Sequence, residues 1–242
     1  MAIVFFTDFG SNDLYVGQVE AVFHREAPGL GVIHLLHEAP RFNPRVSAHL
    51  LAALVTRMPS GHVYVAVVDP GVGSEREAVV IRADGDWFVG PDNGLLSVVA
   101  ERAAAREFWR VVNPPAESSV SFHGRDIFAP IAAGLEIGRP AEDFAVPLKA
   151  LSVSLASGDL AEIIYVDHYG NAFTGIRATN ASTSRQLVVG RREIGHASVF
   201  SSVSPGTAFW YANSVGLVEI AVNGDNAARA LDLTVGQSVG WA

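Results

Sequence analysis

The sequence of 242 residues contains no cysteine. Thiol catalysis, disulfide bonds and cysteine-ligated zinc are therefore excluded. Charged residues are also scarce, at 17% against 49% hydrophobic residues, which is typical of a globular protein and not of a disordered chain. The length suits one large domain or two modest ones with a well-buried core.

The chain has no excess of basic residues, and its formal net charge is -8. Non-specific nucleic-acid binding needs a basic stripe that neutralises phosphates, so we expect no nucleic-acid partner. Long apolar runs are missing as well: none approaches the roughly 20 residues of a membrane span. The first apolar run reaches Asp8 too soon for a signal peptide. We therefore expect no membrane partner and a soluble, cytoplasmic protein.

Strand-like and helix-like segments alternate in the first part of the chain. The expected strands are 3–6, 32–36, 63–68, 79–82, 87–89 and 108–112, and the expected helices are 14–26, 44–58, 95–105 and 127–137. Strands 79–82 and 87–89 would pair as a hairpin across Asp84-Gly85. This alternation predicts an N-terminal α/β domain over residues 1–145, with a mostly parallel central sheet flanked by helices.

The pattern changes after residue 138. We expect a linker at 146–159 and a smaller C-terminal domain at 160–242. That domain would contain the short strands 163–166, 173–176, 187–189, 208–211 and 218–222 and one short helix at 226–231. Asn and Gly punctuate these strands, a pattern typical of a small antiparallel β-barrel or sandwich.

Two aspartates follow the first expected strand, Asp8 and Asp13. In an α/β fold the carboxyl edge of the sheet is the usual ligand crevice, where a carboxylate can accept hydrogen bonds from a ribose diol. The competing interpretation is that both residues cap the next helix. Taken alone, capping is the stronger interpretation.

Two short runs, 68–76 and 122–126, place titratable side chains on tight turns directly after apolar residues. Asp69, Arg76 and His123 together would combine an acceptor, a fixed cation and a group that titrates near neutrality. Such a set can hold and polarise a water molecule. Individually, each also fits an ordinary turn residue, a surface cation or a capping turn.

Three motifs in the second part of the chain resemble ordinary turns when taken one at a time. They are Asp167-His168-Tyr169-Gly170-Asn171, Asn213-Ser214-Val215-Gly216 and Asn226-Ala227-Ala228. Asn and Gly are good turn residues, and the last motif would open a helix.

In combination and in this order, the motifs resemble those of the S-adenosyl-L-methionine hydroxide adenosyltransferases, a family related to fluorinating and chlorinating enzymes. The resemblance runs from residue 7 to about residue 230. It implies an α/β domain joined to a C-terminal β-barrel, and a homotrimer with active sites between one subunit's N-terminal domain and its neighbour's C-terminal domain. The implied reaction is attack of water or hydroxide on the ribose C5′ of S-adenosyl-L-methionine, giving adenosine and L-methionine.

The resemblance also implies residue roles. Asp69, Arg76 and His123 would be catalytic, and which of Asp69 and His123 accepts the proton stays open. Asp8 would hold the ribose diol. The remaining substrate-binding set has apolar walls at Phe122 and Tyr169, methionine contacts at Asn171 and Ser214, adenine contacts at Asn226 and Ala227, and further members at Asp13, Gly124 and Asp167.

The halogenating relatives lack the Asp-Arg-His set, and a carboxylate beside the nucleophile would repel a halide, so water is the expected nucleophile. Val215 stands where the fluorinating enzyme has an arginine near the methionine carboxylate. Because the substrate is itself a sulfonium, no cofactor or metal is expected.

Two other functions are consistent with the residues. One is a metal-dependent hydrolase with ligands drawn from Asp8, Asp13, Asp69, His123 and Asp126, although no His-x-His or His-Glu-x-x-His spacing is present. The other is a protein that binds adenosine or S-adenosyl-L-methionine without turning it over.

Overall fold

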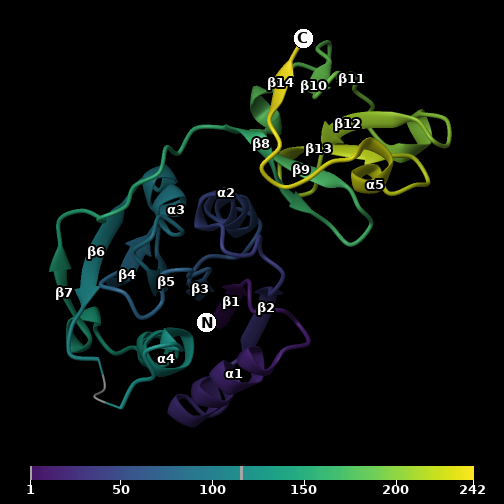
Figure 1. Cartoon of the computed structure of the whole chain (residues 1–242). Helices are drawn as coiled ribbons and strands as arrows, with labels where there is room; N and C mark the ends of the chain where they lie inside the picture. The colour runs from purple at the N-terminus through teal and green to yellow at the C-terminus, as the bar shows by residue number, and fades with distance from the viewer. Residues whose placement is uncertain (1, 115–116) are drawn as a thin grey trace. The chain divides into compact units, whose positions relative to one another are not determined.

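The computed structural model describes residues 2–114 and 117–242 (Figure 1). It divides into two compact units, one comprising the described residues through Leu51 with Met58–Ser157, the other Ala52–Arg57 with Gly158–Ala242. The division therefore falls at Ser157, near the end of the stretch that the sequence predicts to be a linker. No helix in the described ranges is long and apolar enough to cross a bilayer.

Seven strands of the first unit form one sheet in the order β2-β1-β3-β5-β4-β6-β7. Their bounds are β1 Ile3–Thr7, β2 Val32–Leu36, β3 Val63–Val67, β4 Ala78–Ala83, β5 Asp86–Pro91, β6 Arg106–Val111 and β7 Ala145–Leu148. The pairs β2-β1, β1-β3 and β3-β5 are parallel, and the other three pairs are antiparallel. The expected mostly parallel sheet is thus a mixed sheet, because the β4–β5 hairpin reverses the chain direction.

Strand β7 lies in a stretch where the sequence predicts no strand. It pairs with β6 at the edge of the sheet, with Pro147 opposite Trp109. A proline is tolerated on an edge strand because no further strand needs its missing N–H. The short Ala-Val-Pro-Leu segment gives no alternation from which a strand could be predicted.

The helices of the first unit are α1 Leu14–Glu26, α2 Pro44–Val55, α3 Ser97–Arg102 and α4 Ala129–Glu136, with a 3₁₀ turn at Ala141–Asp143. Figure 1 shows α1 and α4 on one face of the sheet and α2 and α3 on the other. Phe5, Phe23 and Phe128 lie in the buried core under α1 and α4. The Oδ1 of Asn43 accepts the Val46 amide at 3.3 Å, so Asn43 caps α2 as expected.

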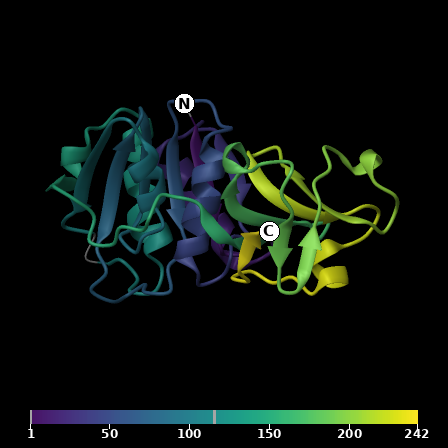
Figure 2. The same cartoon turned by 90° about the horizontal axis from the view of Figure 1, so that it is seen from above.

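Two antiparallel sheets make up most of the second unit (Figure 2). One has the order β12-β13-β9-β8 and the other β11-β10-β14. Their bounds are β8 Leu160–Val166, β9 Ala172–Arg177, β10 Leu187–Val189, β11 Arg192–Ile194, β12 Ala208–Ala212, β13 Leu217–Val222 and β14 Val239–Trp241, with helix α5 at Ala227–Leu231 and 3₁₀ turns at Ala178–Asn180 and Phe200–Ser202. The expected antiparallel domain is confirmed. The strand pairing among the described residues establishes two sheets and not a continuous barrel.

Candidate active site

Asp69 and Arg76 form a buried ion pair on the loop after β3. The guanidinium Nη2 donates to Oδ2 of Asp69, and the side chains are only 5% (Asp69) and 8% (Arg76) exposed. Asp69 Oδ1 and Arg76 Nε are buried without a hydrogen-bond partner among the described residues. A free buried acceptor and a free buried donor are costly in a dry interior, so this pair is suited to meeting a polar ligand.

His123 completes the cluster from a distant part of the chain. Its Nδ1 lies 3.0 Å from Nη2 of Arg76. A guanidinium can only donate, so Nδ1 must accept, and the proton of the neutral ring resides on Nε2. The Arg76 guanidinium and the His123 ring also lie against Phe128, at 5.6 and 6.4 Å from its ring centre.

The surroundings favour the neutral form of His123. Burial lowers the pKa of His123 below its usual 6.5, and the Arg76 cation lowers it further, while the carboxylates of Asp69 and Asp126 oppose this. The direction of the shift agrees with the tautomer that the Arg76 contact requires.

Asp8 lies at the end of the strand next to the Asp69 loop. Strands β1 and β3 are parallel neighbours, with Thr7 opposite Val67, so Asp8 and Asp69 emerge at the same carboxyl edge of the sheet. Oδ2 of Asp8 accepts the Phe42 amide at 3.1 Å. Burial raises the pKa of Asp8, and the Asp69 carboxylate adds to this, while the Phe42 amide partly offsets it.

A small cavity of about 100 Å³ joins these groups. Its lining is Asp8, Phe9, Phe42, Val67, Asp69, Val72, Ser121, Phe122, His123 and Gly124. A cavity of this size has room for a few water molecules and not for a nucleoside. An aromatic cluster of Phe9, Tyr15 and Phe122, with ring centres 5.3 to 5.8 Å apart, borders it.

Two glycines allow the loops around this cavity to touch. A Cβ on Gly73 would come within 2.6 Å of the Val120 carbonyl oxygen, and Gly73 has a φ of +80° that side chains rarely adopt. A Cβ on Gly124 would lie 3.1 Å from the ring of Phe9. Gly73 therefore lets the Asp69–Arg76 loop approach the segment before His123, and Gly124 lets the His123 turn approach Phe9.

The second unit has a larger cavity of about 800 Å³. It includes Asp167, Tyr169, Asn171, Ser214 and Asn226, all of which the sequence predicts to bind substrate, and the apolar side chains of Phe173, Phe200 and Val222. A cavity of this size with aromatic walls and a few polar groups is suited to a nucleoside-sized ligand.

A buried carboxylate, Glu219, organises part of that cavity. Its Oε1 accepts a hydrogen bond from the Tyr211 hydroxyl, and its Oε2 accepts one from the Asn213 side-chain amide at 2.9 Å. Oδ1 of Asn213 in turn accepts the backbone amides of Val215 and Leu217. This network fixes the turn that carries Ser214. Burial raises the pKa of Glu219.

Two of the predicted substrate-binding residues lie outside both cavities. Asp13 is exposed and caps α1, its Oδ1 accepting the Leu14 amide at 2.7 Å. Ala227 is fully buried and is not among the lining residues. Asn226 combines two roles, since it lines the cavity and caps α5 through the Arg229 amide.

Two residues of these cavities, Phe42 and Glu219, carry only a weak signal in the sequence. Phe42 has a left-handed φ of 57° and is 75% exposed, and only its position before the Asn43-Pro44 helix start marks it. Glu219 could have been noticed as a single acid within the apolar strand Leu-Val-Glu-Ile-Ala-Val.

The described residues include no group of three or more His, Asp or Glu side chains placed to hold a metal ion. The acids of the metal-hydrolase alternative have other partners. Asp69 pairs with Arg76, Asp126 pairs with Arg125, and Asp13 caps a helix.

Comparison with known proteins adds to this geometry. Residues 3–145 match the model of the SAM hydroxide adenosyltransferase N-terminal domain, and residues 161–240 match that of the C-terminal domain. The (R)-S-adenosyl-L-methionine hydrolase of Thermus thermophilus is 37% identical over 98% of each chain. A fluorinase from an Actinoplanes species is more distant, at 27% identity over 74% of this chain and 72% of its own. The crystal structure of an uncharacterized conserved protein from Thermotoga maritima superposes with a TM-score of 0.91, at 34% identity, over 99% of this chain and 100% of that one.

Proposed function

Because this chain belongs to the SAM hydroxide adenosyltransferase family, we propose that it hydrolyses S-adenosyl-L-methionine to adenosine and L-methionine. The observation that carries the proposal is the shared guanidinium of Arg76, which contacts both Asp69 and His123 beside the small cavity. Incubating the purified protein with the substrate and following adenosine by chromatography tests it. Tight binding without adenosine would instead point to a binding protein.

The reaction needs an oriented water more than it needs a general acid. The water oxygen forms a bond to C5′ while the C5′–S bond breaks. The electron pair of the C5′–S bond goes to sulfur, and methionine leaves as a neutral thioether. The attacking water then loses one proton. Orientation of water behind the scissile bond can supply several kcal/mol of the roughly 7–11 available to ideal alignment.

Asp69 is the better candidate to accept that proton. Its Oδ1 is a buried acceptor with no partner among the described residues. His123 Nδ1 already accepts from Arg76, so the neutral ring has only the Nε2–H to offer, and this group donates. We therefore assign Asp69 to receive or orient the water proton, and Arg76 and His123 to fix Asp69 and the developing hydroxide by charge and hydrogen bonding.

The charge of the small cavity favours water over a halide. Asp8 and Asp69 both line it, and one cation, Arg76, pairs with Asp69. A fluoride or chloride ion there would meet carboxylates, whereas a neutral water or a sulfonium substrate would not be repelled. Asp8, for which the described residues give no cation within hydrogen-bond distance, is assigned to the ribose diol.

The larger cavity is assigned to the nucleoside and methionine parts of the substrate. Its volume suits a ligand of that size, and Asn171, Ser214 and Asn226 offer polar contacts. Asp13 and Ala227 are kept as substrate contacts only through the family resemblance. No cofactor or metal is assigned.

Two finer features of the family are proposed for this chain. A homotrimer, in which the C-terminal unit of one copy completes the small cavity of another, is supported by the exposure of Phe42 (75%), Val120 (76%) and Tyr169 (76%), because large exposed apolar side chains often mark interfaces. Light scattering of the purified protein tests the trimer.

We also propose that the C-terminal sheets close into a barrel. Two bridges support this closure: Glu162–Ser238 links β8 to the segment before β14, and His196–Trp210 links the segment after β11 to β12.

A further inference from the structure

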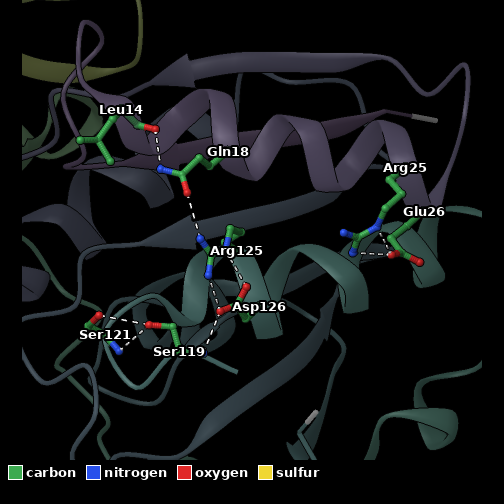
Figure 3. Close-up of polar contacts among 8 residues, drawn as sticks. All are labelled: Leu14, Gln18, Arg25, Glu26, Ser119, Ser121, Arg125 and Asp126. Atoms are coloured by element: carbon green, nitrogen blue, oxygen red, sulfur yellow. Dashed lines mark hydrogen bonds and ion pairs between the residues drawn. The ribbon is translucent and has the colours of Figure 1, made fainter. Parts of the chain in front are cut away.

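The ion pair Arg125–Asp126 lies next to His123 and takes no part in the chemistry assigned above. Nε of Arg125 donates to Oδ1 of Asp126 at 2.6 Å, and Nη2 donates to Oδ2 at 2.8 Å (Figure 3). A bidentate ion pair between a guanidinium and a carboxylate fixes both side chains in one geometry. The Arg125 bonds hold the pKa of Asp126 below its usual range, so the carboxylate stays charged.

This pair is tied to two neighbouring segments. Nη1 of Arg125 donates to Oε1 of Gln18 on α1 at 2.9 Å, and Gln18 is itself anchored through the Leu14 carbonyl at 3.0 Å (Figure 3). On the other side, Oδ2 of Asp126 accepts the Ser119 amide at 2.8 Å. One ion pair thereby connects α1, the loop before His123 and the turn that follows it.

The turn held in this way is a single π-helical turn, Gly124–Phe128, with His123 at its N-terminal cap. The Ala129 amide closes it onto the Gly124 carbonyl. Single π-helical turns are rare and occur frequently at functional sites. The His123 side chain makes no capping bond to this turn, and the backbone of the turn sets the position from which its ring reaches Arg76.

The same arginine also supports the aromatic side of the small cavity. Its guanidinium carbon lies 5.2 Å from the ring centre of Phe122, the residue before His123. Phe122 packs against Phe9 and Tyr15. Arg125 therefore contacts Phe122, one of the four consecutive residues 121–124 that line the small cavity.

We propose that Arg125 and Asp126 are positioning residues that lock the π turn so that Nδ1 of His123 meets Arg76. This rests on the proposed function, since it assigns a catalytic purpose to the His123–Arg76 contact. If the Arg125–Asp126 pair is weakened, His123 loses its contact with Arg76. The set that orients the water then lacks His123, while the substrate-binding residues stay in place.

The chain supplies a control, because Arg25 and Glu26 on α1 also form a pair of adjacent residues, in which Nη2 and Nε of Arg25 lie 2.7 and 2.9 Å from Oε1 of Glu26 (Figure 3). Arg125→Lys and Arg25→Lys each keep a positive charge and lose the planar fork. We expect Arg125→Lys to lower kcat about tenfold with KM changed less than twofold, since small misplacements of catalytic groups cost this much or more. Arg25→Lys should match the wild type.

A second readout does not depend on turnover. The His123 imidazole is followed by NMR titration in both variants, after assignment with His123→Asn. In Arg125→Lys its pKa should rise towards the usual 6.5, because contact with the Arg76 cation is weakened. In Arg25→Lys it should not move.

The outcomes separate the two proposals. A wild type that releases no adenosine refutes the proposed function, and the titration then still decides whether Arg125 positions His123. An unchanged His123 titration in Arg125→Lys overturns the positioning role, whether or not kcat falls. If Arg125→Lys does not fold, Gln18→Ala removes one tether and should produce a smaller rise in the His123 pKa; no rise would again overturn the proposal.

Discussion

Nδ1 of His123 lies 3.0 Å from Nη2 of Arg76, although the two residues are separated by 47 positions in the sequence. Because the arginine can only donate, this contact determines which ring nitrogen carries the proton. The tautomer leaves Asp69 as the acceptor in the cluster and gives the account its clearest consequences.

Asp69→Asn should lower kcat by about 10²-fold while substrate affinity is largely kept. The amide has the shape of the carboxylate but cannot take a proton or balance Arg76. Removing the charge from a buried pair should also cost about 1–3 kcal/mol of unfolding free energy. Steady-state kinetics and thermal unfolding measure both effects. Asp143→Asn, in an exposed pair with Arg139, is the control, and unchanged turnover of Asp69→Asn would remove Asp69 from the mechanism.

Turnover should fall on acidification with a midpoint below pH 6.5. Because the pKa of His123 is lowered, its ring is neutral at neutral pH. Protonation of Nδ1 would leave two donors, Nδ1–H and the Arg76 Nη2, facing each other and would break their hydrogen bond. A pH–rate profile measures this. His123→Asn should be slower at pH 7.5 and should lose this acid limb; an identical limb in the variant would assign it to another group.

Stability should decrease as the pH falls from about 6.5 towards 4, in part through His37. Burial, together with a smaller effect of the neighbouring His34, lowers the pKa of His37 from 6.5 to about 4. Nδ1 of the neutral His37 ring forms a hydrogen bond with Oγ1 of Thr7 at 2.9 Å, and its Nε2 forms one with Nδ1 of His34 at 2.8 Å. Since the unfolded chain takes up this proton near pH 6.5, the contribution of neutral His37 is complete above that pH and is lost below it.

His37→Gln tests this assignment. Urea unfolding at pH 7.5 and 5.0 should show a smaller loss of stability for the variant than for the wild type. An equal loss in both proteins would show that His37 is not responsible.

Asp8→Ala should weaken adenosine binding by roughly 10- to 100-fold, the usual range for hydrogen bonds to a charged group. Calorimetric titration with adenosine measures this, and thermal unfolding shows whether the fold is kept. Asp8 accepts the Phe42 amide and does not cap α1, so we expect a modest fall in melting temperature. Wild-type affinity in the variant would mean that Asp8 serves only the Phe42 turn.

Chelator should leave the rate of adenosine release unchanged. The acids of the metal alternative are engaged by Arg76, by Arg125 and by a helix N-terminus. Activity that is lost in chelator and restored by a divalent cation would contradict this expectation and support the metal-dependent hydrolase.

Local signals predict the elements that have them. The helix expected at 14–26 is α1, because Asp13 caps its start and Pro28-Gly29 follows its end. The hairpin of β4 and β5 follows from Asp84-Gly85, which have positive φ values in the structure. The edge strand β7 has no such signal, because its pairing with β6 is a long-range contact with no local pattern.

The site shows the same division. Asp8 and Asp69 could be placed at one edge of the sheet, because each follows a buried strand and the two strands are parallel neighbours. The Arg76–His123 contact could not be derived from spacing, since it depends on Gly73 packing against Val120. The left-handed Phe42 and the Glu219 network likewise depend on tertiary packing.

The most direct test of the central claim is hydrolysis of S-adenosyl-L-methionine in water labelled with oxygen-18, followed by mass spectrometry of both products. Attack at C5′ predicts that adenosine carries the label at its 5′ oxygen and that methionine is unlabelled. Absence of adenosine, or label that appears in methionine and not in adenosine, would contradict the account.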